Sequence, residues 1–148
     1  MCIRDRSKND LASTLQTIRP NAVEIHTEIN RLDSFGKVVS ILKSSGMKLD
    51  KISISCGLNQ SLKKSQKPED LLKALWERYE ILKIVDIPLI WQLDGWPMSG
   101  DLAPATSRDT VKLFEKIGSD LPPGLIQLAG GTNAVSYTHL TLPTILRV

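Results

Sequence analysis

The run Lys51-Ile52-Ser53-Ile54-Ser55-Cys56 is short, rich in β-branched residues and bounded by turn residues. Three similar runs begin at residues 22, 88 and 124, and each is too short to make a helix. Runs of this kind are typical of buried strands. The distances between their starting points suit a chain that repeats a strand and a helix.

Helical patterns fill the gaps between the four runs. The clearest begins at Pro68, where Glu69 and Asp70 favour the positive end of a helix dipole. Its apolar stripe consists of Leu71, Leu72, Leu75, Trp76, Tyr79 and Leu82. Two further helices are expected, one over about 33–46 and one around Leu11, Leu15 and Ile18.

A fourth helical pattern starts at Thr106, which has the spacing to Asp109 of an acidic capping box. We expect this helix to bury Val111, Phe114 and Ile117. Repetition of strand and helix predicts the α/β class, with a four-stranded parallel sheet and right-handed crossovers. The sheet is expected to be either TIM-barrel-like in part or open, and to be a truncated piece of a longer fold.

Composition narrows the class of protein. The 148 residues allow one domain, and 41% hydrophobic with 24% charged residues argues against wholesale disorder. No apolar stretch approaches the roughly 18 residues that a membrane span needs. Two cysteines cannot build a disulfide framework, which excludes small secreted scaffolds.

Both ends of the chain look foreign to the fold. Residues 1–6 and 135–148 resemble translated sequencing adapters, which contaminate metagenomic reading frames, and they leave 7–134 as the α/β domain. The alternative for the second segment is a genuine short terminal strand. Without the charges of these segments the formal net charge falls from +3 to +1, so no electrostatic case for nucleic-acid binding remains.

The carboxyl ends of the strands are where ligands bind in parallel α/β folds. Applied to this chain, the rule selects a set of polar, glycine and methionine residues as the predicted ligand-binding site. They are Glu24, His26, Asp94, Gly95, Met98, Ser99, Gly100, Asp101, Gly130, Gly131, Thr132 and Asn133. No catalytic or metal-binding residue is assigned.

Each part of this set has two interpretations. Asp94 and Asp101 can accept hydrogen bonds from a ligand, hold Mg²⁺ or act as a base, or they can cap turns of their own loop. The glycines at 130–131 allow backbone amides to approach a small anion, but a Gly-Gly turn is also common. His26 with Glu24 is either an acid–base pair or a hydrogen-bonded network at a strand end.

Cysteine and histidine are scarce within 7–134, where Cys56 and His26 are the single examples. This part of the chain therefore cannot supply a Cys/His metal site by itself. Cys56 ends an apolar run with no base nearby in the sequence, which favours a buried, inert thiol over a nucleophile.

Residues 22–27, 90–101 and 121–133 resemble the C-terminal half of the cyanobacterial light-dependent period family, LdpA. The resemblance implies a cytoplasmic iron–sulfur regulator that carries light or redox information to the circadian clock, with clock or redox-signalling proteins as partners. It places the [4Fe-4S] clusters on ferredoxin-like cysteine motifs. This sequence has none, so the clusters are expected in a missing N-terminal segment.

Three functions remain open from the sequence. The first is a regulator domain that binds a ligand or a partner at the strand-end loops. The second is part of a TIM-barrel-type enzyme acting on a small phosphorylated metabolite, with Glu24, His26, Asp94 and Asn133 as candidates. The third is a scaffold that presents helices to partner proteins.

Overall fold

The computed structural model describes residues 2–3, 8–57, 67–94, 106–129 and 144–146. Strands and helices alternate along the chain, as the sequence predicts. The elements are β1 (Cys2–Ile3), α1 (Lys8–Ile18), β2 (Ala22–Glu28), α2 (Leu32–Ser44), β3 (Lys51–Gly57), α3 (Pro68–Leu82), η2 (Lys83–Val85), β4 (Leu89–Asp94), α4 (Thr106–Ile117), η3 (Gly118–Asp120), β5 (Leu125–Ala129) and β6 (Thr144–Leu146).

The strands form one sheet in the order β1-β2-β3-β4-β5-β6. The predicted four-stranded parallel unit is confirmed as β2 to β5, and the sheet is open and does not close into a barrel. At its edges β1 pairs parallel with β2, and β6 pairs antiparallel with β5. These short pairings do not test whether the terminal segments are native, so their adapter origin stays a prediction.

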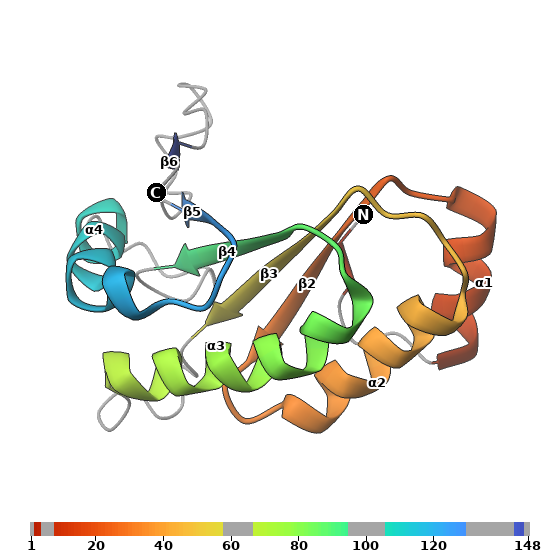
Figure 1. The fold of residues 1–148 in the computed structure, drawn as a ribbon, viewed down its shortest axis with the longest axis horizontal. Helices are drawn as coiled ribbons and strands as arrows, with labels where there is room; N and C mark the ends of the chain where they lie inside the picture. Colours follow the sequence, from red (N-terminus) through yellow and green to blue (C-terminus); the bar gives the residue numbers. More distant parts are fainter. Residues whose placement is uncertain (1, 4–7, 58–66, 95–105, 130–143, 147–148) are drawn as a thin grey trace.

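The four helices lie on one side of the sheet. In a sheet whose strand order follows the sequence, right-handed crossovers send every connecting helix to the same face. Figure 1 shows α2 and α3 side by side beneath the strands, with α1 and α4 toward the two ends, and consecutive helices contact one another. We call the opposite side of the sheet, which no described helix covers, the helix-free face.

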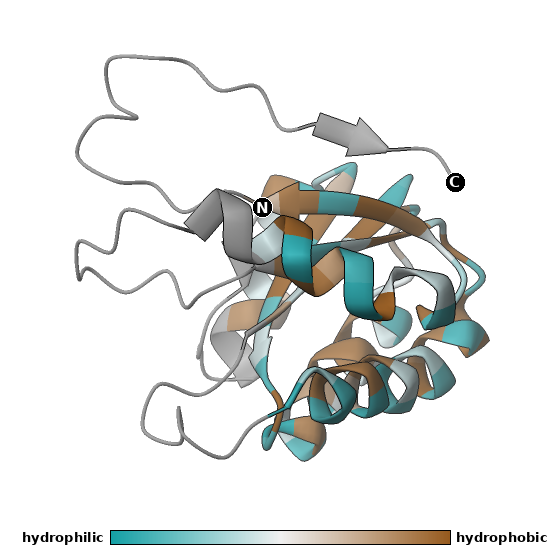
Figure 2. Ribbon diagram, turned by 90° about the vertical axis from the view of Figure 1, so that its left-hand side faces the viewer, coloured by the Kyte–Doolittle hydropathy of each residue, from teal (hydrophilic) through white to brown (hydrophobic). Residues whose placement is uncertain are grey.

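One hydrophobic core joins the sheet to the helices. The strands contribute alternate residues, all buried: Val23, Ile25, Ile52, Ile54, Cys56, Leu89, Trp91, Leu93 and Ile126. Leu15 of α1, Phe35 of α2 and Leu75 of α3 meet them from the helices. Figure 2 shows the hydrophobic residues concentrated along the strands, whereas the helices alternate between hydrophobic and hydrophilic residues. Because side chains alternate across a strand, the intervening residues face the other way.

The start of α3 follows the sequence prediction. Pro68 occupies the first turn, and the Lys67 backbone N–H donates to the Asp70 carboxylate at 2.8 Å. This bond satisfies an N–H at the helix entry, and the carboxylates of Glu69 and Asp70 lie near the positive end of the dipole. None of the described helices is long and apolar enough to cross a membrane.

The predicted inner face of α4 is wrong at one position. Val111 is 45% exposed, whereas Ile117 is buried as expected and Phe114 packs against the core. Thr110 and Leu113 are buried instead. The Thr110 hydroxyl donates to the Ala129 carbonyl of β5 at 2.8 Å, which turns Thr110 inward and Val111 outward.

Two apolar residues of other helices also lie farther out than their patterns predict. Ile18 of α1 is 57% exposed and Trp76 of α3 is 40% exposed. The Trp76 indole donates to the backbone carbonyl of Asp120 at 2.8 Å, so its ring bridges α3 and η3 at the surface. A tryptophan with a polar N–H suits such a partly exposed position.

Candidate functional site

The carboxyl ends of the parallel strands lie at one level of the sheet. Glu28 of β2 is opposite Gly57 of β3, and Asp94 of β4 is opposite Ala129 of β5. The chain runs directly from these strand ends into the predicted site loops. We call this edge of the sheet the carboxyl rim.

The structure describes three of the predicted site residues. Glu24 and His26 lie within β2, and Asp94 is the last residue of β4. The remaining predicted residues lie outside the described part of the chain, and the site they were expected to form stays a prediction. They are Gly95, Met98, Ser99, Gly100, Asp101, Gly130, Gly131, Thr132 and Asn133.

Glu24 and His26 form a close pair on the helix-free face. Their Oε1 and Nε2 atoms are 3.2 Å apart, and the side chains are 34% and 17% exposed, respectively. The spacing of two residues along a strand places both on the same face. Such a pair can orient the imidazole toward a ligand, and it remains reachable from that face.

Glu28 continues this alternation but pairs with a different residue. Its carboxylate lies 3.8 Å from the Arg31 guanidinium Nε, and both side chains are about half exposed. Charge pairs with this exposure contribute little to stability. The His26 network therefore involves Glu24, and the Glu28 carboxylate pairs at the rim with Arg31.

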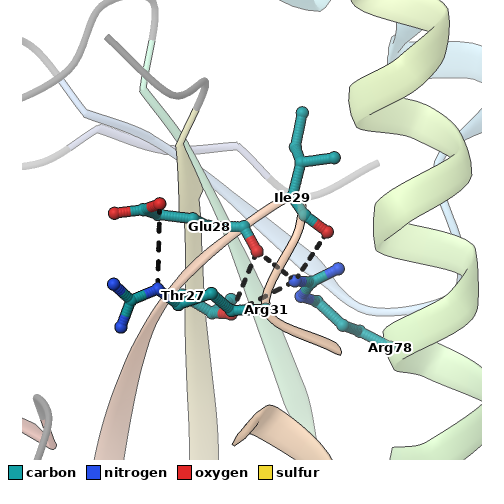
Figure 3. A network of polar contacts seen from close by, with 5 residues as sticks. All are labelled: Thr27, Glu28, Ile29, Arg31 and Arg78. Atoms are coloured by element: carbon teal, nitrogen blue, oxygen red, sulfur yellow. Dashed lines mark hydrogen bonds and ion pairs between the residues drawn. The ribbon is translucent and has the colours of Figure 1, made fainter. Parts of the chain in front are cut away.

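A buried arginine holds the end of β2 in place. Arg78 of α3 is fully buried, and its Nη2 donates to the Thr27 hydroxyl at 3.1 Å and to the Glu28 carbonyl at 2.5 Å. The same Nη2 also donates a longer hydrogen bond to the Ile29 carbonyl, at 3.4 Å. Figure 3 shows these contacts converging on the turn between β2 and α2. Arg78 therefore fixes the backbone that carries Glu28 into the rim.

Arg78 makes two further contacts, one with an aromatic ring and one with a backbone carbonyl. Its guanidinium carbon lies 5.4 Å from the centre of the Phe35 ring, and its Nη1 donates to the Ala74 carbonyl at 2.9 Å. No carboxylate in the described ranges forms a salt bridge with it, and its Nε has no hydrogen-bond partner there. Backbone carbonyls and an aromatic face stabilise the charge in place of a counter-ion.

Polar side chains cross the helix-free face in a row just below the rim. The strand register places His26 opposite Ser55, Ser55 opposite Gln92, and Gln92 opposite Gln127. One level farther from the rim, Ser53 lies between Glu24 and Ile90. Neighbouring strands are about 4.8 Å apart, so these side chains form one continuous polar surface.

Sequence reasoning missed most of this row. The signal was present, because Ser53 and Ser55 alternate with isoleucines and Gln92 stands between Trp91 and Leu93. Polar residues at alternate positions of an apolar strand indicate that one face of the sheet is polar while the other packs in the core. Arg78 left no such signal, since it lies in a helix among charged residues.

The described residues offer few groups that could bind a metal ion. Within the described ranges no three His, Cys, Asp or Glu residues come together in a way that could hold a metal ion. A [4Fe-4S] cluster takes four thiolates, and the sequence has two cysteines, of which Cys56 is 1% exposed in the core. These residues do not fit a complete cluster.

An open groove of about 730 Å³ runs along the outer side of α2. Gly36, Ser40 and Ser44 line it with Ile81 of α3. It lies on the helices, whereas the rim and the polar row belong to the sheet, and none of the predicted site residues lines it.

Comparison with known proteins places the chain in a family. Residues 14–147 match the family described as the Light dependent period A C-terminal domain. A curated protein of Synechococcus elongatus described as Light dependent period A is 36% identical over 120 residues, which cover 81% of this chain and 32% of that protein. The chain thus spans about a third of the length of this relative. Because the family match covers most of the chain, the chain belongs to the Light dependent period A C-terminal domain family.

Proposed function

We propose that this chain is the C-terminal domain of a light- and redox-responsive regulator of the circadian clock, and that it binds a ligand or a partner at the carboxyl rim. Membership of the family supports the regulatory part of the proposal. The observation that carries the binding part is the register that sets Asp94 opposite Ala129 at the rim. Both strands lead from there directly into the predicted loops.

The loops after β4 and β5 have complementary chemistry. Asp94 and Asp101 offer carboxylates, whereas the glycines at 130–131 with Thr132 and Asn133 offer backbone amides and short polar side chains. The second set suits a small anionic ligand, and the first suits hydrogen-bond donors of a partner protein. Clock or redox-signalling proteins in the cytoplasm are the partners that the family implies.

The iron–sulfur clusters implied by the family belong, in this proposal, to sequence outside these 148 residues. Two cysteines cannot ligate a [4Fe-4S] cluster alone. The domain would then respond to the state of a neighbouring cluster-bearing region through its rim. The enzyme alternative receives no support from the family match.

The test uses the complete protein in cyanobacterial cells that lack their own copy. The double variant Asp94→Asn/Asp101→Asn keeps side-chain size and removes two charges. We expect it to abolish the dependence of the circadian period on light intensity, while the protein accumulates to its normal level. Asp50→Asn is the matched control, because Asp50 is exposed at the amino end of β3, opposite the rim.

An unchanged period response in the double variant, at normal protein level, would refute a role of these carboxylates at the rim. Loss of response in Asp50→Asn as well would show that the assay reports a general effect of charge removal. Circular dichroism of the purified variants checks that the fold is retained.

A further inference from the structure

The outer edge of β2, which is the side of that strand facing away from β3, is only partly paired. β3 pairs with all residues of β2 from Ala22 to Glu28, whereas β1 pairs with Glu24 and Ile25 alone among the described residues. Positions 23, 26 and 27 therefore have no strand opposite them on this side in the ranges that the structure describes. A partly paired edge of this kind is a template on which another strand can add.

The order of the elements specifies which strand belongs at this edge. Each later helix connects two strands that lie side by side: α2 joins β2 to β3, α3 joins β3 to β4, and α4 joins β4 to β5. α1 stands at the same stage of the repeat, directly before β2, and it contacts α2 on the helix side of the sheet (Figure 1). A right-handed crossover through α1 places a parallel strand of the preceding sequence next to β2.

β1 occupies this position but is shorter than its neighbours. It consists of Cys2 and Ile3, and it runs parallel to β2 as the crossover requires. The strands β2 to β5 have five to seven residues each. β1 ends opposite Ile25, so the part of β2 nearest the carboxyl rim, His26 to Glu28, extends beyond it.

The complete protein has sequence from which a longer strand can come. The chain matches 32% of the length of Light dependent period A from Synechococcus elongatus, so most of that relative lies outside the match. The matching family is described as a C-terminal domain, which places the larger part of such a protein before this region.

We propose that the outer edge of β2 binds a parallel strand from the sequence that precedes α1 in the complete protein, and that this strand extends the sheet to the carboxyl rim beside His26. Its residues opposite Val23 and Ile25 are apolar, because those two side chains are buried in the core and cross-strand neighbours share a face. Ile3, opposite Ile25, already has this character. The inference goes beyond the proposed function, since it concerns how the domain joins the rest of the protein and requires no ligand at the rim.

Hydrogen–deuterium exchange compares the complete protein with the 148-residue chain. Backbone N–H groups alternate between the two sides of a strand, so about half of those in 22–28 point toward the outer edge. We expect this half to exchange at least about tenfold more slowly in the complete protein. The matched control is β3, which has a strand on both sides in the 148-residue chain and whose exchange rates should change much less.

A deletion identifies the strand that provides this protection. In the complete protein we remove the alternating apolar run found within about 15 residues before α1, a distance that allows one strand and its connecting loop. The amides of β2 should then exchange as fast as in the 148-residue chain, while those of β3 stay protected and show that the domain is folded. A deletion of equal length at the amino terminus of the complete protein is the control and should leave β2 protected.

Four results would overturn the proposal. The first is unchanged exchange in β2 between the complete protein and the 148-residue chain. The second is slowing of β2 and β3 by the same factor, which would indicate general stabilisation. The third is new protection at β5 without any at β2, which would place the added strand at the opposite edge of the parallel sheet. The fourth is full protection of β2 after removal of the run before α1.

Discussion

Arg78 of α3 donates from Nη2 to the backbone carbonyl of Glu28 at 2.5 Å, across 50 positions of sequence. The same nitrogen reaches the Thr27 hydroxyl, so one buried guanidinium joins the third helix to the end of β2. This contact between distant parts of the chain fixes the path of the backbone as it leaves β2 at the carboxyl rim.

Replacing this arginine tests how much the fold depends on it. Arg78→Met keeps most of the length of the side chain but removes the guanidinium that donates to the carbonyls of Ala74 and Ile29. We expect the free energy of unfolding to fall by about 2–3 kcal/mol in urea titration, because hydrogen bonds from a charged donor are lost inside the protein. Arg78→Lys should recover only part of the loss, since an ammonium cannot reproduce the planar fork.

The control for this prediction is Lys73→Met on the same helix. The Lys73 side chain is 79% exposed and lies 4.0 Å from Glu77. Exposed pairs contribute little, so a change within about 0.5 kcal/mol is expected. An Arg78→Met protein as stable as the parent would show that the buried guanidinium is dispensable.

Replacing glycine by alanine should change the stability in opposite directions at Gly124 and Gly36. A Cβ at Gly124, where φ is +151°, would lie 2.8 Å from the Trp91 indole nitrogen and 3.1 Å from the Leu89 carbonyl. The Trp91 indole donates to the Pro123 carbonyl at 3.1 Å and is fully buried, so it has little room to move. Gly124→Ala should therefore lower the free energy of unfolding by about 1–3 kcal/mol.

Gly36→Ala is the matched substitution, within α2. A Cβ there meets only the Ile81 side chain, at an ordinary contact distance of 3.9 Å. Alanine favours the helix over glycine, so we expect stabilisation by about 0.5–1 kcal/mol. Thermal unfolding followed by circular dichroism compares the two variants; equal effects of the same sign would contradict the close packing around Trp91.

Thr110 positions α4 against the sheet. Thr110→Val keeps the shape of the side chain but removes the hydroxyl that donates to the Ala129 carbonyl. We expect a loss of about 1–2 kcal/mol in the free energy of unfolding, because the partly buried carbonyl loses a donor. Thr17→Val removes an equivalent bond to the Ser13 carbonyl on an exposed helix turn, and should change stability by less than about 0.5 kcal/mol.

Cys56 should be chemically silent in the folded protein. Its side chain is 1% exposed within the core. In a Cys2→Ser background, we expect a thiol reagent to label Cys56 at least about 100-fold more slowly in buffer than in denaturing urea, since labelling requires opening of the core. A Cys2→Ser/Cys56→Ala/Ser40→Cys chain, with its thiol at an exposed position of α2, supplies the rate of a free cysteine. Equal rates for Cys56 in the two conditions would reveal an accessible thiol and reopen a redox role.

The strands and helices could be predicted because their signals are local. The strands over 51–57 and 89–94 follow short apolar runs, and α3 begins at the proline and acidic residues that favour its first turn. The apolar stripe of α4 predicted its buried residues less accurately. A stripe gives the average direction of the buried side, but a single hydrogen bond from Thr110 sets which residues face the sheet.

The candidate site was predictable only in part, for a related reason. The sequence indicated that Glu24 and His26 share a face, because alternation along one strand determines that relationship. It could not bring Gln92 next to Ser55 and Gln127, since cross-strand neighbours depend on the register between segments more than thirty residues apart. It could not show that the Ser53 hydroxyl is buried without a hydrogen-bond partner among the described residues, because the bonding of a polar group depends on everything packed around it.

The sequence by itself determined the α/β class, the order of its elements and the alternation that gives every strand an apolar and a polar side. These features follow from backbone geometry and the periodicity of side chains within short segments. Only the tertiary structure decided that the sheet stays open, that Arg78 anchors the end of β2 and that four polar side chains align across the helix-free face. Those features depend on strand register and on packing between distant segments, which no short stretch of sequence encodes alone.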